Sequence, residues 1–158
     1  MPFPMQLSRL SWLRGRWQAT VVDSPNDCSA ERVNLSSELC LLSPCGGAMP
    51  GVWRLGPGPF LLISIREVEG VLEWRQQEHY PSLDVRLSTP LLVMRGVSVS
   101  EAEIILESVG ETGHPRFRHL RQIFSLMAEG ELRVRSLVLT EGGAWLSVRD
   151  EIHRRSAV

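Results

Sequence analysis

Apolar and polar residues alternate along most of this chain with the two-residue period of β-strands. The clearest example is residues 60–79, in which apolar side chains occupy every second position from Leu61 to Ile65 before a turn at Glu69-Gly70. Residues 120–139 repeat the arrangement around Glu129-Gly130. Because period-two alternation places the apolar side chains on one strand face and short Gly turns join antiparallel neighbours, both stretches are predicted to be β-hairpins.

The same reading along the rest of the chain predicts about ten strands separated by Gly, Pro, Ser and Asp clusters. The predicted strands are 16–22, 30–42, 49–55, 60–68, 71–79, 84–94, 102–108, 120–127, 131–139 and 145–155. Many short strands joined by turns favour an antiparallel up-and-down β-barrel, because closure leaves no unpaired edge strand. A β-sandwich is the alternative architecture.

The first residues depart from this pattern. Leucines recur at every third position in the segment Met5–Leu13, which predicts a short helix or 3₁₀ turn. Gly15 follows and permits a sharp turn into the first strand. We therefore expect an all-β chain with a single domain over residues 1–158, an up-and-down barrel with a short N-terminal helix that plugs one end.

Composition narrows the classes of function. The chain has 158 residues, of which 43% are hydrophobic and 22% charged, as in ordinary globular domains. A net charge of −1 argues against a nucleic-acid partner, and no apolar run approaches the roughly 18–20 residues that span a membrane. Three cysteines in a chain without an apolar signal segment indicate free thiols and a cytoplasmic protein.

Two features resemble known barrels, and the first is Gly15-Arg16-Trp17 directly after the short helix. Lipocalins and their calycin relatives begin their first strand in a similar way. In those barrels the tryptophan closes one end, and an arginine from the last strand packs across its ring. The resemblance implies that Arg154 or Arg155 does so here, a cation–π contact worth roughly 0.5–2 kcal/mol.

The second feature is the segment 45–51, Cys-Gly-Gly-Ala-Met-Pro-Gly. It resembles the Gly-Gly-x-Met-x-Gly segment of an uncharacterised bacterial family of lipocalin-like domains. The hairpin turn at Glu69-Gly70 and the pair His79-Tyr80 at a strand end are similar to that family as well. Pro50 and the non-aromatic stretch 40–42 depart from the pattern near the expected pocket. The resemblance therefore implies a barrel, and it brings no settled activity or ligand with it.

A looser resemblance is to nitrobindin-like haem barrels. Those proteins begin with Leu-x-Gly-x-Trp, as in residues 13–17, and end with a histidine before paired arginines, as in His153-Arg154-Arg155. The resemblance implies His153 as an axial ligand of haem iron, the usual role of histidine in haem proteins. The other histidines lack metal-ligand spacing, and nucleotide and hydrolase motifs are absent, so neither a cofactor nor a metal is the preferred prediction.

The preferred function is binding of a small hydrophobic or amphipathic molecule in the barrel cavity. Trp53 and Trp74, if they point inward, would line that cavity with flat apolar walls. Arg54, His79 and Tyr80 are the polar ligand-binding candidates.

Three alternatives remain open. The first is a small barrel enzyme of the cyclase or isomerase type, which confines its substrate and uses His79, Tyr80 or Glu38 as an acid or base. The second is the haem barrel. The third is a barrel whose exposed apolar wall forms a homodimer.

Overall fold

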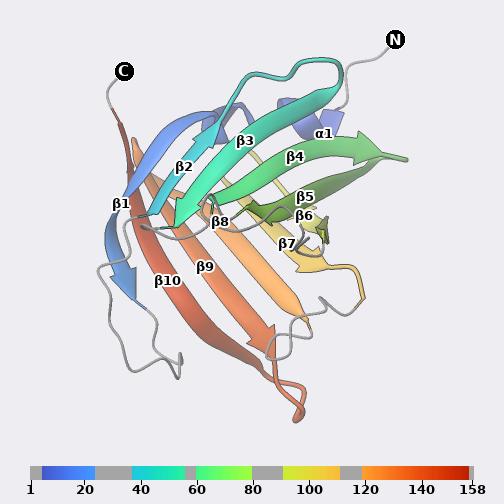
Figure 1. Ribbon diagram of the computed structural model, residues 1–158, viewed down its shortest axis with the longest axis vertical. Helices are drawn as coiled ribbons and strands as arrows, with labels where there is room; N and C mark the ends of the chain where they lie inside the picture. The colour runs from blue at the N-terminus through green and yellow to red at the C-terminus, as the bar shows by residue number, and fades with distance from the viewer. Residues whose placement is uncertain (1–4, 24–36, 56–59, 80–90, 111–118, 157–158) are drawn as a thin grey trace.

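Ten strands form one closed antiparallel barrel in the computed structural model of the chain (Figure 1). The structure describes residues 5–23, 37–55, 60–79, 91–110 and 119–156. Each strand pairs with the strand that follows it in sequence, and the first strand pairs with the last, so the ring of hydrogen bonds has no break. The predicted up-and-down barrel is confirmed, and the sandwich alternative is wrong.

The helical segment at the start consists of α1 (Met5–Ser8) and the 3₁₀ turn η1 (Ser11–Leu13), as the leucine spacing predicts. The strands are β1 (Gly15–Asp23), β2 (Ser37–Leu41), β3 (Ala48–Leu55), β4 (Phe60–Val68), β5 (Val71–His79), β6 (Leu92–Val99), β7 (Glu103–Ser108), β8 (Leu120–Ala128), β9 (Glu131–Leu139) and β10 (Trp145–Arg155). Both predicted hairpins, β4–β5 and β8–β9, are confirmed.

The strand predicted over residues 84–94 is wrong in its boundaries, because β6 continues to Val99. The first part of the predicted range lies outside the described residues. The strand passes Gly96 through a bulge, at which its register against β7 shifts between Gly96 and Ser98. A Cβ at Gly96 would lie 3.1 Å from the Cβ of Leu72 on β5, so the close approach of the two strands favours glycine there.

The helical segment covers the end of the barrel at which β1 begins. Leu7, Leu10 and Leu13 are buried against the core, and Trp17 is completely buried beneath them. The indole Nε1 of Trp17 donates a hydrogen bond to the carbonyl oxygen of Leu13 at 2.9 Å. This contact fixes the segment onto the barrel, so the expected plug at one end is confirmed. Among the described residues, no helix is long and apolar enough to span a membrane.

The barrel interior is mostly apolar, and most of its buried polar side chains lie on one side. Buried apolar side chains from β1 to β9 pack into one core that includes Leu39, Met49 and Ile65. Buried polar side chains concentrate on β8, β9 and β10, where Gln122 and Ser136 face inward. Because polar atoms inside a barrel need partners, this polar side is the part of the interior that calls for a functional explanation.

Candidate ligand-binding site inside the barrel

Three ionisable side chains on β10 point into the barrel. Arg149, Glu151 and His153 occupy alternate positions, and residues two apart on a strand share one face. Glu151 and His153 are both 0% exposed, whereas the Arg149 side chain keeps 20% of its surface exposed. Charged residues are almost never fully buried without a partner, so the burial of Glu151 marks this group as unusual.

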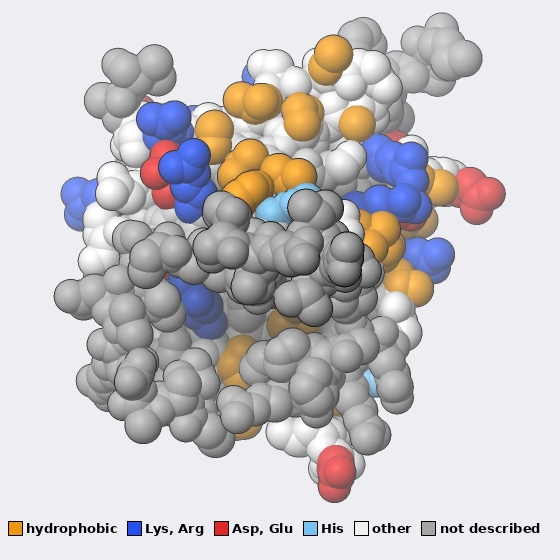
Figure 2. All heavy atoms as spheres, in the orientation of Figure 1, with side chains coloured by type: hydrophobic (Ala, Val, Ile, Leu, Met, Phe, Trp, Pro, Cys, Tyr) orange, Lys and Arg blue, Asp and Glu red, His pale blue; other side chains and the backbone are white. Residues whose placement is uncertain are grey.

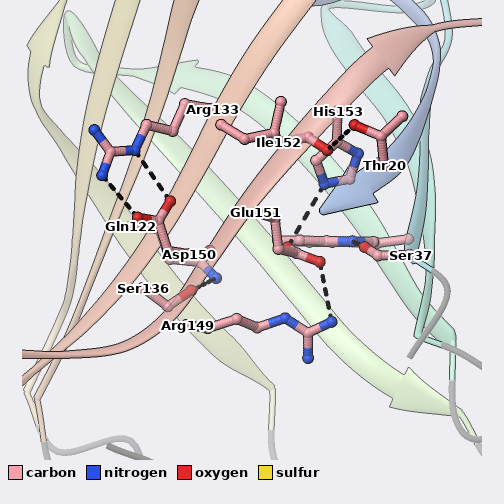
Figure 3. Close-up of polar contacts among 11 residues, drawn as sticks. Thr20, Ser37, Gln122, Arg133, Ser136, Arg149, Asp150, Glu151, Ile152 and His153 are labelled. Carbon is pink, nitrogen blue, oxygen red and sulfur yellow. Dashed lines mark hydrogen bonds and ion pairs between the residues drawn. The ribbon is translucent and has the colours of Figure 1, made fainter. Parts of the chain in front are cut away.

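Glu151 lies between the other two side chains (Figure 3). Its Oε1 accepts a hydrogen bond from Nη2 of Arg149 at 3.0 Å, and this contact is also an ion pair. Its Oε2 lies 3.6 Å from Nε2 of His153. That second distance is too long for a hydrogen bond, although the two groups would attract each other strongly if the imidazole were protonated.

The charges around Glu151 keep its carboxyl group ionised. Burial raises the pKa of Glu151. The neighbouring His153 and the positive charge of Arg149 together lower the pKa by more than burial raises it, so the pKa is below the ordinary value for glutamate. Glu151 is therefore an interior carboxylate at neutral pH. A buried carboxylate with one oxygen unpartnered can accept a hydrogen bond from a hydroxyl or amino group placed beside it.

Several buried atoms of this side of the interior have no hydrogen-bond partner among the described residues. They are both ring nitrogens of His153, Oε2 of Glu151, Nε of Arg149 and Oε1 of Gln122. Buried polar atoms are normally paired, and each unsatisfied group costs about 1–3 kcal/mol. The polar side of the interior therefore offers donors and acceptors that a bound molecule can satisfy.

Aromatic side chains form an apolar wall within the same interior. The ring of Phe124 on β8 stacks on Trp74 with a centroid distance of 5.0 Å and tilts against Trp53 at 5.9 Å. Trp53 is 2% exposed and Trp74 is 0% exposed, so both side chains point into the barrel. The two indole N–H groups already donate, to Ser37 Oγ at 2.7 Å and to Gln76 Oε1 at 3.1 Å.

The other sequence candidates within the described residues lie on the outside. Arg54 on β3 and His79 at the end of β5 are both exposed. His79 stacks on Phe60 at 5.6 Å, while Glu38 forms an ion pair with Arg16 at 3.0 Å. The structure therefore does not bring Arg54, His79 or Glu38 together with Trp53 and Trp74.

The alternation of side chains explains this placement. His79 is an odd number of residues from the inward-facing Trp74, and Arg54 directly follows the inward-facing Trp53, so each points to the opposite face. An interior role for these residues has no support in the structure. Tyr80 lies outside the described residues.

The outer wall carries an apolar patch over β3 and β4, with arginines on either side of it (Figure 2). Leu62 is 43% exposed there, next to Val52 in the β3–β4 register. An exposed apolar patch on a sheet is compatible with the homodimer predicted from the sequence. The subunit number stays a prediction.

Sequence reasoning missed Arg149 and Glu151 as functional candidates. In the part of β10 after its bulge, the ionisable residues Arg149, Glu151 and His153 face inward, whereas the apolar Ile152 lies on the opposite face and is more exposed than Glu151 and His153. This reverses the usual rule that apolar residues indicate the inner face. Ionisable residues at every second position of β10 were a sign that they share one face. Such a face on a strand is ordinarily interpreted as the solvent-exposed outer one.

No group of three or more His, Cys, Asp or Glu side chains that could hold a metal ion occurs within the described part of the chain. Cys40 and Cys45 are free thiols, as expected, and Cys28 lies outside the described residues. No protein-family model matches this chain. No curated protein matches its sequence either.

Proposed function

We propose that this protein binds a small amphipathic molecule inside the barrel and directs the polar group of that molecule to Arg149, Glu151 and His153. One observation carries the proposal. Of the eight buried side-chain atoms without a hydrogen-bond partner among the described residues, five belong to these three side chains and to Gln122 on β8. A ligand that supplies partners for these atoms would recover the free energy lost to their desolvation.

The chemistry of the site describes the ligand. The guanidinium of Arg149 donates hydrogen bonds, Glu151 accepts them, and the imidazole of His153 can do either. A ligand with a hydroxyl and a carbonyl or carboxylate oxygen would match this set. The faces of Trp53, Trp74 and Phe124 suit a flat apolar body, because their polar N–H groups are already bonded. The resemblance to lipocalin-like bacterial domains is consistent with this proposal and stays a hypothesis.

An enzyme of the same shape is the second candidate, and the contact between His153 and Glu151 favours it. A carboxylate 3.6 Å from the imidazole Nε2 can hold the ring in a fixed orientation beside a bound substrate. Confinement of a substrate beside such a pair suits a cyclisation or isomerisation, in which one proton moves and nothing else is transferred. In this candidate function, the acid/base residue is His153 in place of His79.

Native mass spectrometry of the protein as purified is the first test, because it reports a bound molecule and the subunit number together. Absorption spectroscopy of the same sample tests the haem alternative through a Soret band. A band that disappears in His153→Phe would assign the site to haem and overturn the proposal of an organic ligand.

The second test uses anilinonaphthalene sulfonate, a dye with an apolar body and one anionic group, and follows its fluorescence. Arg149→Met should raise the dissociation constant by about tenfold or more, since a charge-assisted hydrogen bond is lost. Arg54→Met removes an arginine of the outer wall and should leave dye binding unchanged. Equal affinity of the wild type and Arg149→Met would contradict the proposed site.

His153→Phe and His79→Phe form a second matched pair, one inside the barrel and one outside it. Weakened binding in the first variant alone supports the interior site. Weakened binding only in His79→Phe would move the site to the outer wall.

A further inference from the structure

A groove of about 480 Å³ lies at the helical end of the barrel, between α1, η1 and the connection from β2 to β3. Figure 1 shows α1 and that connection at the same end of the molecule. The volume is within the range of small-molecule sites, roughly 300–1,000 Å³. Leu7 and Met49 form its floor, and both belong to the buried core, so the floor separates the groove from the barrel interior.

Arg14 is the only charged residue among those that line this groove. Its Nη1 donates to Ser43 Oγ at 3.3 Å, and no carboxylate among the described residues forms an ion pair with it. The contrast with Arg16, two residues away, is direct, because Arg16 pairs with Glu38 at 3.0 Å. A guanidinium has five donors in a planar fork that matches a carboxylate, and within the described part of the chain Ser43 Oγ is the acceptor that the Arg14 side chain contacts.

The remaining lining gives the groove two kinds of surface. Ser11 and Ser43 place hydroxyl groups near the arginine, whereas Leu7, Met49 and Pro44 are apolar. No residue of the lining is acidic, so nothing within the described groove competes with an anion for Arg14. A single cation above an apolar floor is suited to a monoanion with a hydrocarbon body, and a dianion such as a phosphate ester would lack a second cation.

We propose that this groove binds a small amphipathic carboxylate. The carboxylate group pairs with the guanidinium of Arg14 and accepts a hydrogen bond from the Ser43 hydroxyl. The apolar tail lies over Leu7 and Met49. This site is independent of the interior site, because the two lie on opposite sides of the plug formed by the helical segment.

Titration of the isotope-labelled protein with octanoate, followed by amide NMR shifts, tests the proposal. The amides of Gly46 and Gly47, which line the groove, should shift with a single saturable curve. Octanol has the same tail without the charge and should bind at least about tenfold more weakly. Shifts confined to amides of β8, β9 and β10 would show that octanoate enters the barrel, and they would overturn the groove as its site.

Matched variants separate the groove from other contributions. Arg14→Met should remove the shifts at Gly46 and Gly47, whereas Arg9→Met removes an exposed arginine of the same segment and should leave them unchanged. Arg149→Met alters only the interior site, so octanoate shifts at the two glycines should persist in it. Their loss in Arg149→Met, or their persistence in Arg14→Met, would refute the proposal.

Ser11→Phe provides a test that leaves the arginine in place. Ser11 is exposed, so the larger side chain fills the groove and leaves the core unchanged. Octanoate binding should be lost in this variant while the rest of the amide spectrum keeps its wild-type pattern. Unchanged binding in Ser11→Phe would place the ligand elsewhere.

Discussion

The guanidinium of Arg155 lies 4.3 Å from the ring centroid of Trp17, so the last strand of the barrel closes over the first. Two nitrogens of the same guanidinium donate to backbone carbonyl oxygens of the helical segment, Nη1 to Arg14 at 2.6 Å and Nη2 to Trp12 at 2.7 Å. One side chain therefore joins β1, β10 and η1. Of the two arginines that the resemblance to lipocalins implied, Arg155 makes the contact, and Arg154 is on the outside with Glu131.

Arg155→Ala should destabilise the protein, because it removes the cation–π contact and leaves two backbone carbonyl oxygens without their charged donor. The cation–π contact alone is worth about 0.5–2 kcal/mol. Arg154→Ala is the matched control, since that side chain is 71% exposed and its ion pair is at 3.9 Å. Urea unfolding at pH 7 measures both variants. Equal losses of stability in the two would show that Arg155 has no special role.

Gly15→Ala tests the space beneath Arg155. Gly15 has φ of +110°, and a Cβ there would lie 2.8 Å from Nη1 of Arg155. The alanine therefore combines backbone strain of about 1–3 kcal/mol with displacement of the guanidinium. Gly143→Ala is the control, because Gly143 has φ of +84° with open space around it, so only the backbone term applies. Thermal unfolding should show the larger loss for Gly15→Ala, and the reverse order would contradict this account.

The fold was predictable because its signals are local. In β4, β5 and β9 the alternation of apolar residues and the turn residues beside the strands place both ends as the structure has them. The end of β6 was missed because Gly96 looks like a terminator in sequence. Its actual role depends on Leu72, a residue 24 positions earlier in the chain, and no local pattern contains that contact.

The candidate site was predictable only in its apolar half. Trp53 and Trp74 were candidates because they are large and apolar, although the strand pattern left open whether they point inward or outward. Arg149 and Glu151 were missed because a charged residue on a strand normally indicates solvent. Their inward position depends on the bulge between Ser147 and Arg149, at which the β9–β10 register shifts. A bulge changes which face each later residue occupies, and the sequence carries no clear mark of it.

Gln122→Met should be neutral or stabilising in the absence of ligand. The Oε1 atom of Gln122 is buried without a partner among the described residues, so its removal ends a desolvation cost of about 1–3 kcal/mol. The substitution also removes the hydrogen bond that Nε2 of Gln122 donates to Ser136 Oγ at 3.3 Å, a contact worth about 0.5–1.5 kcal/mol, which offsets part of that gain. The same variant should weaken ligand binding if the polar interior is a binding site. Differential scanning calorimetry of the ligand-free protein measures the stability change.

Gln76→Met is the control for that substitution, with the same change of side chain at another interior position. Gln76 Oε1 accepts the indole N–H of Trp74 at 3.1 Å, so its removal leaves a buried donor unpaired and should destabilise the protein by about 1–3 kcal/mol. If both substitutions destabilise to the same extent, the Oε1 atom of Gln122 must have a partner in the folded protein.

The buried carboxylate of Glu151 should make the protein less stable at acid pH, and added salt should change this loss of stability little. The folded-state pKa of Glu151 is below its unfolded value, which is about 4.3. The stability linked to this group is therefore fully present above that pH, and it is lost as the pH falls through the folded pKa. The pKa of Glu73 on the outer wall is also lowered, chiefly by the hydrogen bond that its carboxylate accepts from Arg75. The stability linked to Glu73 is therefore lost at acid pH as well.

Salt separates the two carboxylates in this experiment. Urea unfolding between pH 7 and pH 3 should show a smaller loss of stability in Glu151→Gln than in the wild type, at low salt and at about 1 M salt alike, because buried pairs are screened weakly. The corresponding difference for Glu73→Gln should shrink at high salt, since Arg66 and Arg75 are each about two-fifths exposed, at 42% and 39%. A wild-type pH profile in Glu151→Gln would show that Glu151 does not titrate as a charged interior group, and the polar site built around it would lose its central acceptor.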